Sequence, residues 1–170
     1  AGKVATFKGV AIDKVLVRAE GEEVREQDTD QSGSYTLETY EQSGYTVSAS
    51  KTTEEQQHTG ISTLDIIAAR RHILQIREFD NPYQSIAADV NMSKSLTALD
   101  LLQMRRIVLG MDKVNQSGLN WLFIPKAQDL TSDPFSYDTQ LAINLAEEDV
   151  ELDFVAVKIG DVNGSWKGGS

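Results

Sequence analysis

The stretch that decides the fold is a duplicated segment. Gly60-Ile-Ser-Thr-Leu-Asp-Ile-Ile-Ala-Ala-Arg-Arg-His-Ile-Leu74 recurs as Ser95-Leu-Thr-Ala-Leu-Asp-Leu-Leu-Gln-Met-Arg-Arg-Ile-Val-Leu109. Apolar residues recur at intervals of three and four in both copies, which is typical of an amphipathic helix. The sequence therefore predicts two helices related by an internal duplication. Gly110 predicts the end of the second helix, and the break at Asn81-Pro82 predicts a short helix between the copies, near residues 83–87.

An oxygen-rich loop leads into the second copy, as Asp89-Val-Asn-Met-Ser-Lys-Ser-Leu-Thr-Ala-Leu-Asp100. Oxygen-bearing residues stand at loop positions 1, 3, 5, 7 and 9, with a carboxylate at position 12, which is the spacing of calcium-binding loops. We predict that six residues bind Ca²⁺ here: Asp89, Asn91, Ser93, Ser95, Thr97 and Asp100. The loop departs from the EF-hand pattern at position 6, where Lys94 replaces glycine, at the neutral Ser93, and at Asp100, where EF-hands carry Glu.

For both copies of the segment, an interpretation without a bound metal is also possible. Thr97 with Asp100, and Ser62 with Asp65, have the spacing of a capping box, in which a hydroxyl and a carboxylate satisfy the first backbone N–H groups of a helix. Either pair can therefore serve helix capping alone.

The loop before the first copy lacks suitable ligands, because Glu54, Gln56 and His58 occupy positions 1, 3 and 5 and an imidazole is a poor ligand for calcium. A near copy of 89–93 occurs instead at Asp161-Val-Asn-Gly-Ser165, with no closing carboxylate after it. We predict a second, split Ca²⁺ site, formed by Asp161, Asn163 and Ser165 together with Gly60, Ser62 and Asp65. The alternative is that residues 161–165 form a turn that begins a severed loop.

The remaining segments have β character. Residues 1–52 contain short β-branched and aromatic runs between turn clusters, which predicts a small antiparallel β-sandwich. Similar runs return after residue 116. We therefore expect an α+β fold in three parts: a sandwich over 1–52, a calcium-binding helix pair over 53–115, and a β segment over 116–170 that returns to the first calcium loop.

Composition excludes several function classes. Sixteen Lys and Arg against 26 Asp and Glu give a net charge of −10, which disfavours binding to nucleic acid. No run of apolar residues is long enough to predict insertion into a membrane. The chain has no cysteine and no recognisable Ser/His/Asp arrangement, and its best-grouped carboxylates are explained as ligands, so we expect no catalytic activity.

The loop and helix motifs resemble those of the dockerin type I module. The resemblance rests on Ala88-Asp-Val-Asn91 and Leu99-Asp-Leu-Leu-Gln-Met-Arg-Arg-Ile-Val-Leu-Gly110, and it covers residues 57–112 and 159–165. It implies a pair of F-hand helices, two Ca²⁺ sites, and attachment to a cohesin-like or other extracellular protein. The implied partner-binding positions are Thr63, Leu64, Ala98 and Leu99, with the pairs Arg70-Arg71 and Arg105-Arg106; a solvated helix face is the alternative for the arginines.

Three further stretches carry resemblances of their own. Thr29-Asp-Gln-Ser-Gly-Ser-Tyr35 and Gly44-Tyr-Thr-Val47 resemble prealbumin-like or Cna-B-type sandwiches, and Val157-Lys-Ile-Gly-Asp-Val-Asn-Gly164 resembles C-terminal regions of secreted bacterial surface proteins. The implied function is a non-catalytic extracellular or cell-surface module for attachment or assembly within a larger protein. The alternatives are a carbohydrate-binding accessory module, in which Trp121 and Trp166 stack on sugar rings instead of lying in the core, or a calcium-stabilised structural spacer.

Overall fold

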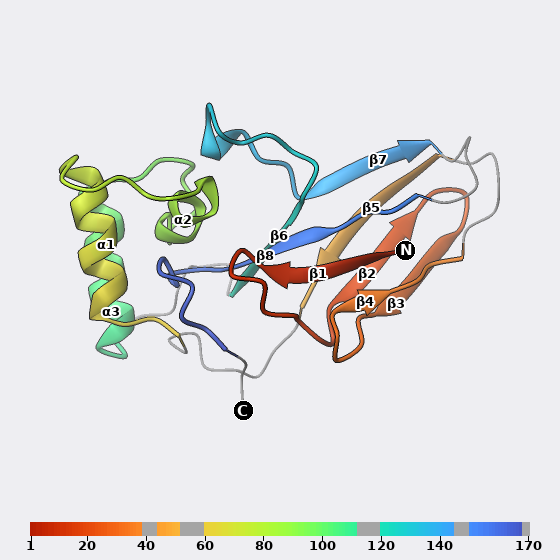
Figure 1. The fold of residues 1–170 in the computed structure, drawn as a ribbon, viewed down its shortest axis with the longest axis horizontal. Coiled ribbons are helices and arrows are strands. Elements are labelled where there is room, and N and C mark those ends of the chain that lie inside the picture. Colours follow the sequence, from red (N-terminus) through yellow and green to blue (C-terminus); the bar gives the residue numbers. More distant parts are fainter. Residues whose placement is uncertain (39–43, 52–59, 112–119, 145–149, 168–170) are drawn as a thin grey trace. The chain divides into compact units, whose positions relative to one another are not determined.

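The computed structural model describes residues 1–38, 44–51, 60–111, 120–144 and 150–167. These residues form an α+β fold with two four-stranded sheets and three α-helices, compatible with a β-sandwich plus helices (Figure 1). The elements are β1 (Gly2–Thr6), β2 (Leu16–Glu20), β3 (Val24–Asp28), β4 (Ser34–Tyr35), β5 (Gly44–Ser50), α1 (Thr63–Ile73), α2 (Pro82–Ala88), α3 (Ala98–Val108), β6 (Trp121–Pro125), the 3-10 helix η1 (Pro134–Ser136), β7 (Gln140–Asn144) and β8 (Phe154–Lys158). The expected part limits at 52/53 and 115/116, and the expected loop residues Glu54, Gln56 and His58, lie outside the described residues.

Strands from both ends of the chain share the two sheets. The strand orders are β4-β1-β8-β6 and β3-β2-β5-β7. In the second sheet every pairing is antiparallel, with Val17 opposite Ala49 and Val47 opposite Leu141. The strands of residues 1–52 pair with one another in antiparallel fashion, as expected, whereas β1 pairs in parallel with β8 from the C-terminal segment. A parallel pair needs a long crossover connection, and here most of the chain, including all three helices, lies between the two strands.

The described residues divide into two compact units. Unit 1 comprises residues 1–53, 123–128 and 137–156, and unit 2 comprises 54–122, 129–136 and 157–170, with the undescribed residues excepted throughout. The core of unit 1 contains alternating residues of β2, namely Val17 and Ala19, together with Val15, which immediately precedes this strand. A buried tyrosine closes this core, because the Tyr35 hydroxyl donates a hydrogen bond to the carbonyl of Leu152.

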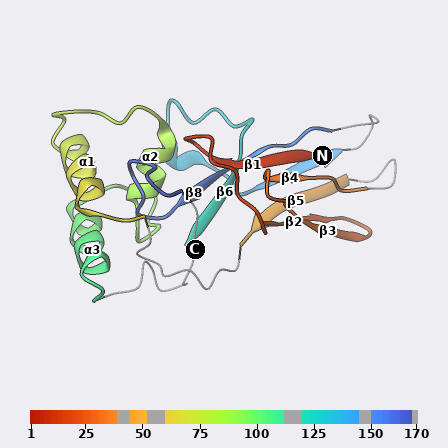
Figure 2. The same cartoon turned by 60° about the horizontal axis from the view of Figure 1, so that its bottom comes forward.

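The helices of unit 2 confirm the duplication seen in the sequence. Ser62 and Thr97 are the N-caps of α1 and α3, and each forms a complete capping box with its Asp three residues on. The two helices pack against each other, side by side in Figures 1 and 2, and bury Ala69 on α1 and Met104 and Ile107 on α3.

The helix ends also correspond between the copies. Gly110 follows α3 with φ +70°, and Gln75 takes the same left-handed conformation after α1 with φ +58°. Glycine adopts this conformation without strain, and glutamine does so at a cost, so the first copy keeps the shape of the C-terminal turn with a less suited residue. The short helix α2 begins at Pro82 after an Asn81 cap and ends at Ala88, so it extends one residue beyond the predicted range 83–87 at each end. No helix of the described residues is long and apolar enough to cross a membrane.

Candidate metal centre

The Asp89 loop curls around the carboxylate at its first position. Asp89 Oδ1 accepts hydrogen bonds from the backbone N of Ser93 at 3.1 Å and from Ser93 Oγ at 3.2 Å, while Asp89 Oδ2 accepts from the N of Lys94 at 2.7 Å. Asn91 Oδ1 also accepts from Ser93 N at 3.0 Å. Met92 and Lys94 have φ values of +56° and +59°, so Lys94 adopts the left-handed turn that glycine normally takes at position 6. The loop therefore forms despite that departure from the pattern.

Asp100, the carboxylate at the last position of this loop, uses only one of its two oxygens in hydrogen bonds among the described residues. Asp100 is completely buried, and its Oδ2 accepts from Thr97 N at 2.9 Å within the capping box. Its Oδ1 is buried with no hydrogen-bond partner among the described residues. A buried carboxylate oxygen without a donor costs free energy, so capping alone leaves half of this side chain unexplained.

Four of the six ligands expected in the Asp89 loop are linked by hydrogen bonds around its first turn, namely Asp89, Asn91, Ser93 and Ser95. Ser93 Oγ contacts both the carbonyl and the hydroxyl oxygen of Ser95, at 3.2 and 3.1 Å. Burial raises the pKa of Asp89, and the negative charge of Asp100 adds to this effect, so the two carboxylates lie within electrostatic reach of each other. Within the described ranges, no three His, Cys, Asp or Glu side chains lie close enough to hold a metal by themselves. A cation here would therefore depend on amide, hydroxyl and carbonyl oxygens as well as on two carboxylates.

Residues predicted for the split site also meet. The backbone N of Asn163 donates to Asp65 Oδ1 at 3.0 Å, although 98 residues separate them in the chain. Ser165 Oγ donates to the Gly60 carbonyl at 3.2 Å. Figure 2 shows the blue C-terminal segment running beside the yellow segment that precedes α1. The distant stretches are therefore adjacent, as the sequence predicted; cation binding there stays a prediction.

Burial opposes charge on the carboxylates of both loops. Burial is the largest cause that raises the pKa of Asp65 to about 6, against the lowering effect of hydrogen bonds from Asn163 and Ser62. Burial likewise raises the pKa of Asp89 and of Asp161. Each loop therefore holds anionic groups in places where their charge is poorly solvated, and a bound cation would offset that cost.

This raised pKa predicts a pH dependence for the protein in EDTA. Asp65 binds a proton more tightly in the folded chain than in the unfolded chain, where its pKa is near 3.9. The free energy of unfolding should therefore fall as the pH rises from about 4 to about 6, by on the order of 3 kcal/mol for this group. Urea unfolding across that range measures the slope. Asp65→Asn, which cannot titrate, should flatten it, and an unchanged slope in this variant would contradict the assignment.

Sequence reasoning missed several main-chain and polar contacts that shape the site. Trp166 N donates to Asp161 Oδ2 at 3.0 Å, in the same way as Lys94 N does to Asp89. Gln84 on α2 donates through Nε2 to the Val162 carbonyl at 3.0 Å, and Gly160 N donates to the Ala87 carbonyl at 2.8 Å. The repeated Asp-Val-Asn motif could have indicated the first contact, whereas no local pattern indicates the contacts with α2.

The aromatic and histidine candidates have packing roles. Trp121 and Trp166 are both buried and meet edge to face, with ring centroids 4.7 Å apart. His72 stacks on Phe79 at a centroid distance of 4.0 Å, and its Nδ1 accepts a hydrogen bond from Phe79 N. Trp121 and Trp166 therefore lie in the core and do not present their rings for sugar stacking, and His72 packs against Phe79.

The predicted partner-binding positions lie on exposed helix surface. Thr63 and Leu64 on α1, and Ala98 and Leu99 on α3, are exposed, and so are all four arginines of the Arg70-Arg71 and Arg105-Arg106 pairs. Further exposed apolar side chains accompany them on the same two helices, namely Ile67 and Leu102. These positions are therefore accessible within unit 2.

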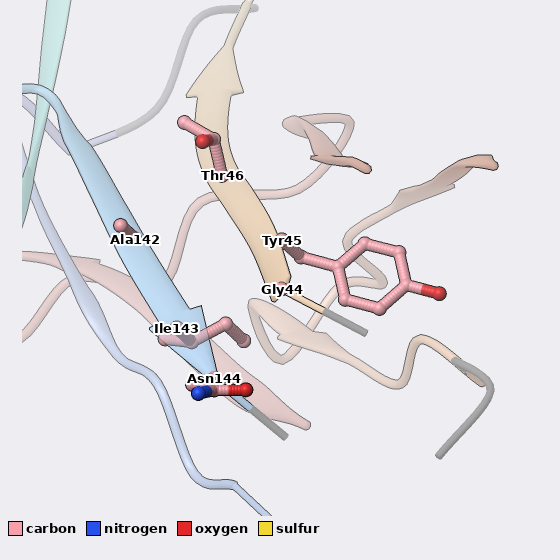
Figure 3. A pocket seen from close by; sticks show the side chains of 6 residues that line it. All are labelled: Gly44, Tyr45, Thr46, Ala142, Ile143 and Asn144. Carbon is pink, nitrogen blue, oxygen red and sulfur yellow. The ribbon is translucent and has the colours of Figure 1, made fainter. Parts of the chain in front are cut away.

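Unit 1 has a hollow of about 420 Å³ at one end of the paired strands β5 and β7 (Figure 3). Its lining residues are Gly44, Tyr45, Thr46, Ala142, Ile143 and Asn144. None of them is charged, and the Tyr45 ring extends away from β7 (Figure 3). The hollow therefore lacks the charged groups that fix the orientation of a ligand in many small-molecule sites.

Comparison with known proteins gives no assignment, because no family model matches the chain and neither the curated proteins nor the solved structures include a significant match.

Proposed function

We propose that this chain is a non-catalytic, calcium-stabilised module that works outside the cell, where it attaches a larger secreted protein to a partner protein. The observation that carries the proposal is the unpartnered Oδ1 of the fully buried Asp100 at the end of the Asp89 loop. Asp89 and Asp100 are both buried carboxylates. Calcium takes six to eight oxygen ligands, and its positive charge would balance the negative charge of this pair. Extracellular calcium sites of this type bind in the range of about 10⁻⁴–10⁻³ M.

The ligand types favour calcium over other cations. The loop offers carboxylate, amide, hydroxyl and carbonyl oxygens from Asp89, Asn91, Ser93, Ser95 and Asp100, with Thr97 at position 9. Hard cations prefer such oxygens, while zinc and copper prefer nitrogen and sulfur. Magnesium demands a tight octahedron and retains several waters, so a loop with many protein ligands suits it less well.

The outer surface of the helix pair supports attachment to a protein. Leu64 and Leu99 are 64% and 52% exposed at equivalent positions of the two copies, and Leu74 and Leu109 repeat this equivalence at the helix ends. Exposed apolar side chains grouped on one element and flanked by charged groups are typical of protein-binding surfaces. A cohesin-like extracellular domain is the partner class that the dockerin resemblance implies.

The alternatives receive less support. A carbohydrate-binding module presents aromatic rings on its surface, whereas every aromatic side chain that the structure describes is buried or half-buried. A structural spacer would use the same calcium sites without binding a partner, so binding measurements separate it from an attachment module.

Two measurements test the proposal. Calorimetric titration of the calcium-stripped chain with Ca²⁺ should show binding that Asp89→Asn weakens by at least about tenfold, because the variant keeps the side-chain shape and loses one ligand charge. A chain that binds no calcium would refute the module. Surface plasmon resonance against immobilised cohesin domains tests attachment, with the Leu64→Arg/Leu99→Arg double variant as the control. Calcium binding without any cohesin binding would favour the spacer.

A further inference from the structure

Asn163-Gly164 is the only Asn-Gly pair in the chain, and it lies in the described segment that follows β8. An asparagine followed by glycine is chemically labile. The backbone N of the next residue attacks the side-chain amide carbon most readily where that residue has no side chain to obstruct it. Both residues of the pair are half-buried, so they keep contact with solvent. The pair is therefore a candidate for covalent change without an enzyme.

The Asp89 loop contains the same turn with a different residue after the asparagine. In both turns the serine two residues further on donates its backbone N to the asparagine Oδ1, at 3.0 Å. The residue between them is left-handed in each case, with φ +56° for Met92 and φ +68° for Gly164. Asn91 and Asn163 thus make the same side-chain hydrogen bond, and they differ in whether a side chain follows.

Two backbone N–H groups at the C-terminal turn favour the reaction. Gly164 N donates to the carbonyl of Asp161 at 3.4 Å, whereas the equivalent hydrogen bond in the Asp89 loop measures 3.1 Å. The longer hydrogen bond holds the attacking nitrogen less firmly. Ser165 N already donates to Asn163 Oδ1, the oxygen that gains negative charge as the nitrogen adds to the amide carbon. A donor in place before the reaction stabilises that charge.

We propose that Asn163 deamidates spontaneously, with water as the only co-reactant. The bond from Gly164 N to Asn163 Cγ forms, the bond from Cγ to the side-chain nitrogen breaks, and ammonia leaves with the proton of the Gly164 N–H. Water then opens the resulting succinimide at one of its two carbonyl carbons. Opening at Cγ gives aspartate. Opening at the main-chain carbonyl gives isoaspartate, in which the chain continues through the former side chain.

Both products disturb the buried acidic groups nearby. Asn163 N donates to Oδ1 of the fully buried Asp65 at 3.0 Å, and burial together with the charge of Asp161 raises the pKa of Asp65. A new carboxylate at 163 is therefore unfavourable. Isoaspartate also lengthens the backbone by one carbon, which displaces the N atoms of Ser165 and Trp166 from the Asp161 carboxylate that accepts from them. Deamidation should therefore loosen the C-terminal segment.

Ageing the intact chain in heavy-oxygen water tests the inference, because the new carboxylate takes one oxygen from the solvent. A mildly alkaline buffer favours the reaction, since the attacking N–H loses its proton. Tryptic digestion in ordinary water then releases Asn163 in the peptide 159–167 and Asn91 in the peptide 78–94. Mass spectrometry should find the heavy oxygen at residue 163 and none at residue 91.

Two reciprocal variants serve as controls. Gly164→Met copies the natural Asn91-Met92 pair, and the left-handed Met92 shows that this turn accepts a methionine. This variant should lose the label at residue 163. Met92→Gly should gain a label at Asn91. Neither substitution removes an asparagine or a backbone N–H group.

Thermal melting measures the consequence. The aged intact chain should melt at a lower temperature than the fresh chain, whereas ageing should leave the melting temperature of Gly164→Met unchanged. Asn163→Asp should reproduce part of the fall, because it adds the charge without the longer backbone of isoaspartate.

The outcomes are distinct. Peptide 159–167 without heavy oxygen would overturn the inference, since the fold would then protect Asn163. Equal labelling of Asn91 and Asn163 would overturn the role given to Gly164. A labelled chain that melts like the fresh one would overturn the effect on the C-terminal segment. None of these outcomes depends on calcium binding, so the proposed function stands or falls separately.

Discussion

Removal of calcium with EGTA is expected to lower the melting temperature by about 5–15 °C for each site that is occupied. A ligand at 100–1,000 times its Kd stabilises the folded state by about 2.7–4.1 kcal/mol. For a chain of this length, each kcal/mol shifts the melting temperature by about 2–4 °C. Differential scanning calorimetry in calcium and in EGTA measures the shift.

The intrinsic fluorescence shows which unit responds. Both tryptophans of the chain, Trp121 and Trp166, belong to unit 2, which also contains all the predicted ligands. Tryptophan emission should therefore report the loss of stability in EGTA. Added magnesium should restore much less of it than calcium does, and an identical melt with and without EGTA would refute calcium stabilisation.

Trp166→Ala is expected to lower the free energy of unfolding of unit 2 by about 3–5 kcal/mol, because a large buried aromatic side chain is removed and leaves a cavity. Trp166 is 7% exposed, meets Trp121 edge to face and covers Gly60. Its loss should also weaken calcium binding at the split site, since the wall against Gly60 disappears. Urea unfolding followed by circular dichroism measures the stability.

Lys167→Ala is the matched control for this variant, because Lys167 is the next residue and is exposed. We expect a change within about 0.5 kcal/mol for it. A similarly small effect of Trp166→Ala would mean that the C-terminal segment contributes little to unit 2, and it would count against the split site as well.

The helices could be predicted because their signals are local. Apolar spacing, the Ser62 and Thr97 caps and the turn at Gly110 each act within a few residues, and α1 and α3 begin and end close to the predicted positions. Strand β3 was not predicted, since Val24 is the only apolar residue in Val24–Asp28 and the strand lies at a sheet edge. Edge strands tolerate polar residues on both faces, so alternation fails to mark them.

The pairing of distant strands could not be predicted from the sequence, and the reason is physical. The parallel pair of β1 with β8 joins residues about 150 apart, and no local pattern specifies a partner at such separation. Contacts between the loop segments could be predicted more readily. The Asp-Val-Asn motif occurs at 89 and at 161, and the duplication indicates that the segment from Gly60 corresponds to the second half of the Asp89 loop. The contact of Asn163 with Asp65 could be predicted in this way, whereas the hydrogen bond from Gln84 to Val162 could not.

The meeting of Trp166 and Gly60 has a consequence for chain topology. The Cα of Trp166 lies 3.5 Å from the point where a Cβ on Gly60 would stand, so the two residues are in close contact although they are far apart in the chain. A circularly permuted polypeptide that runs from 166 directly into 60 would have one uninterrupted loop of the same length as residues 89–100. The predicted first loop of unit 2 is thus opened between its sixth and seventh positions, and the three helices and strands β6 to β8 lie in the chain between its two halves.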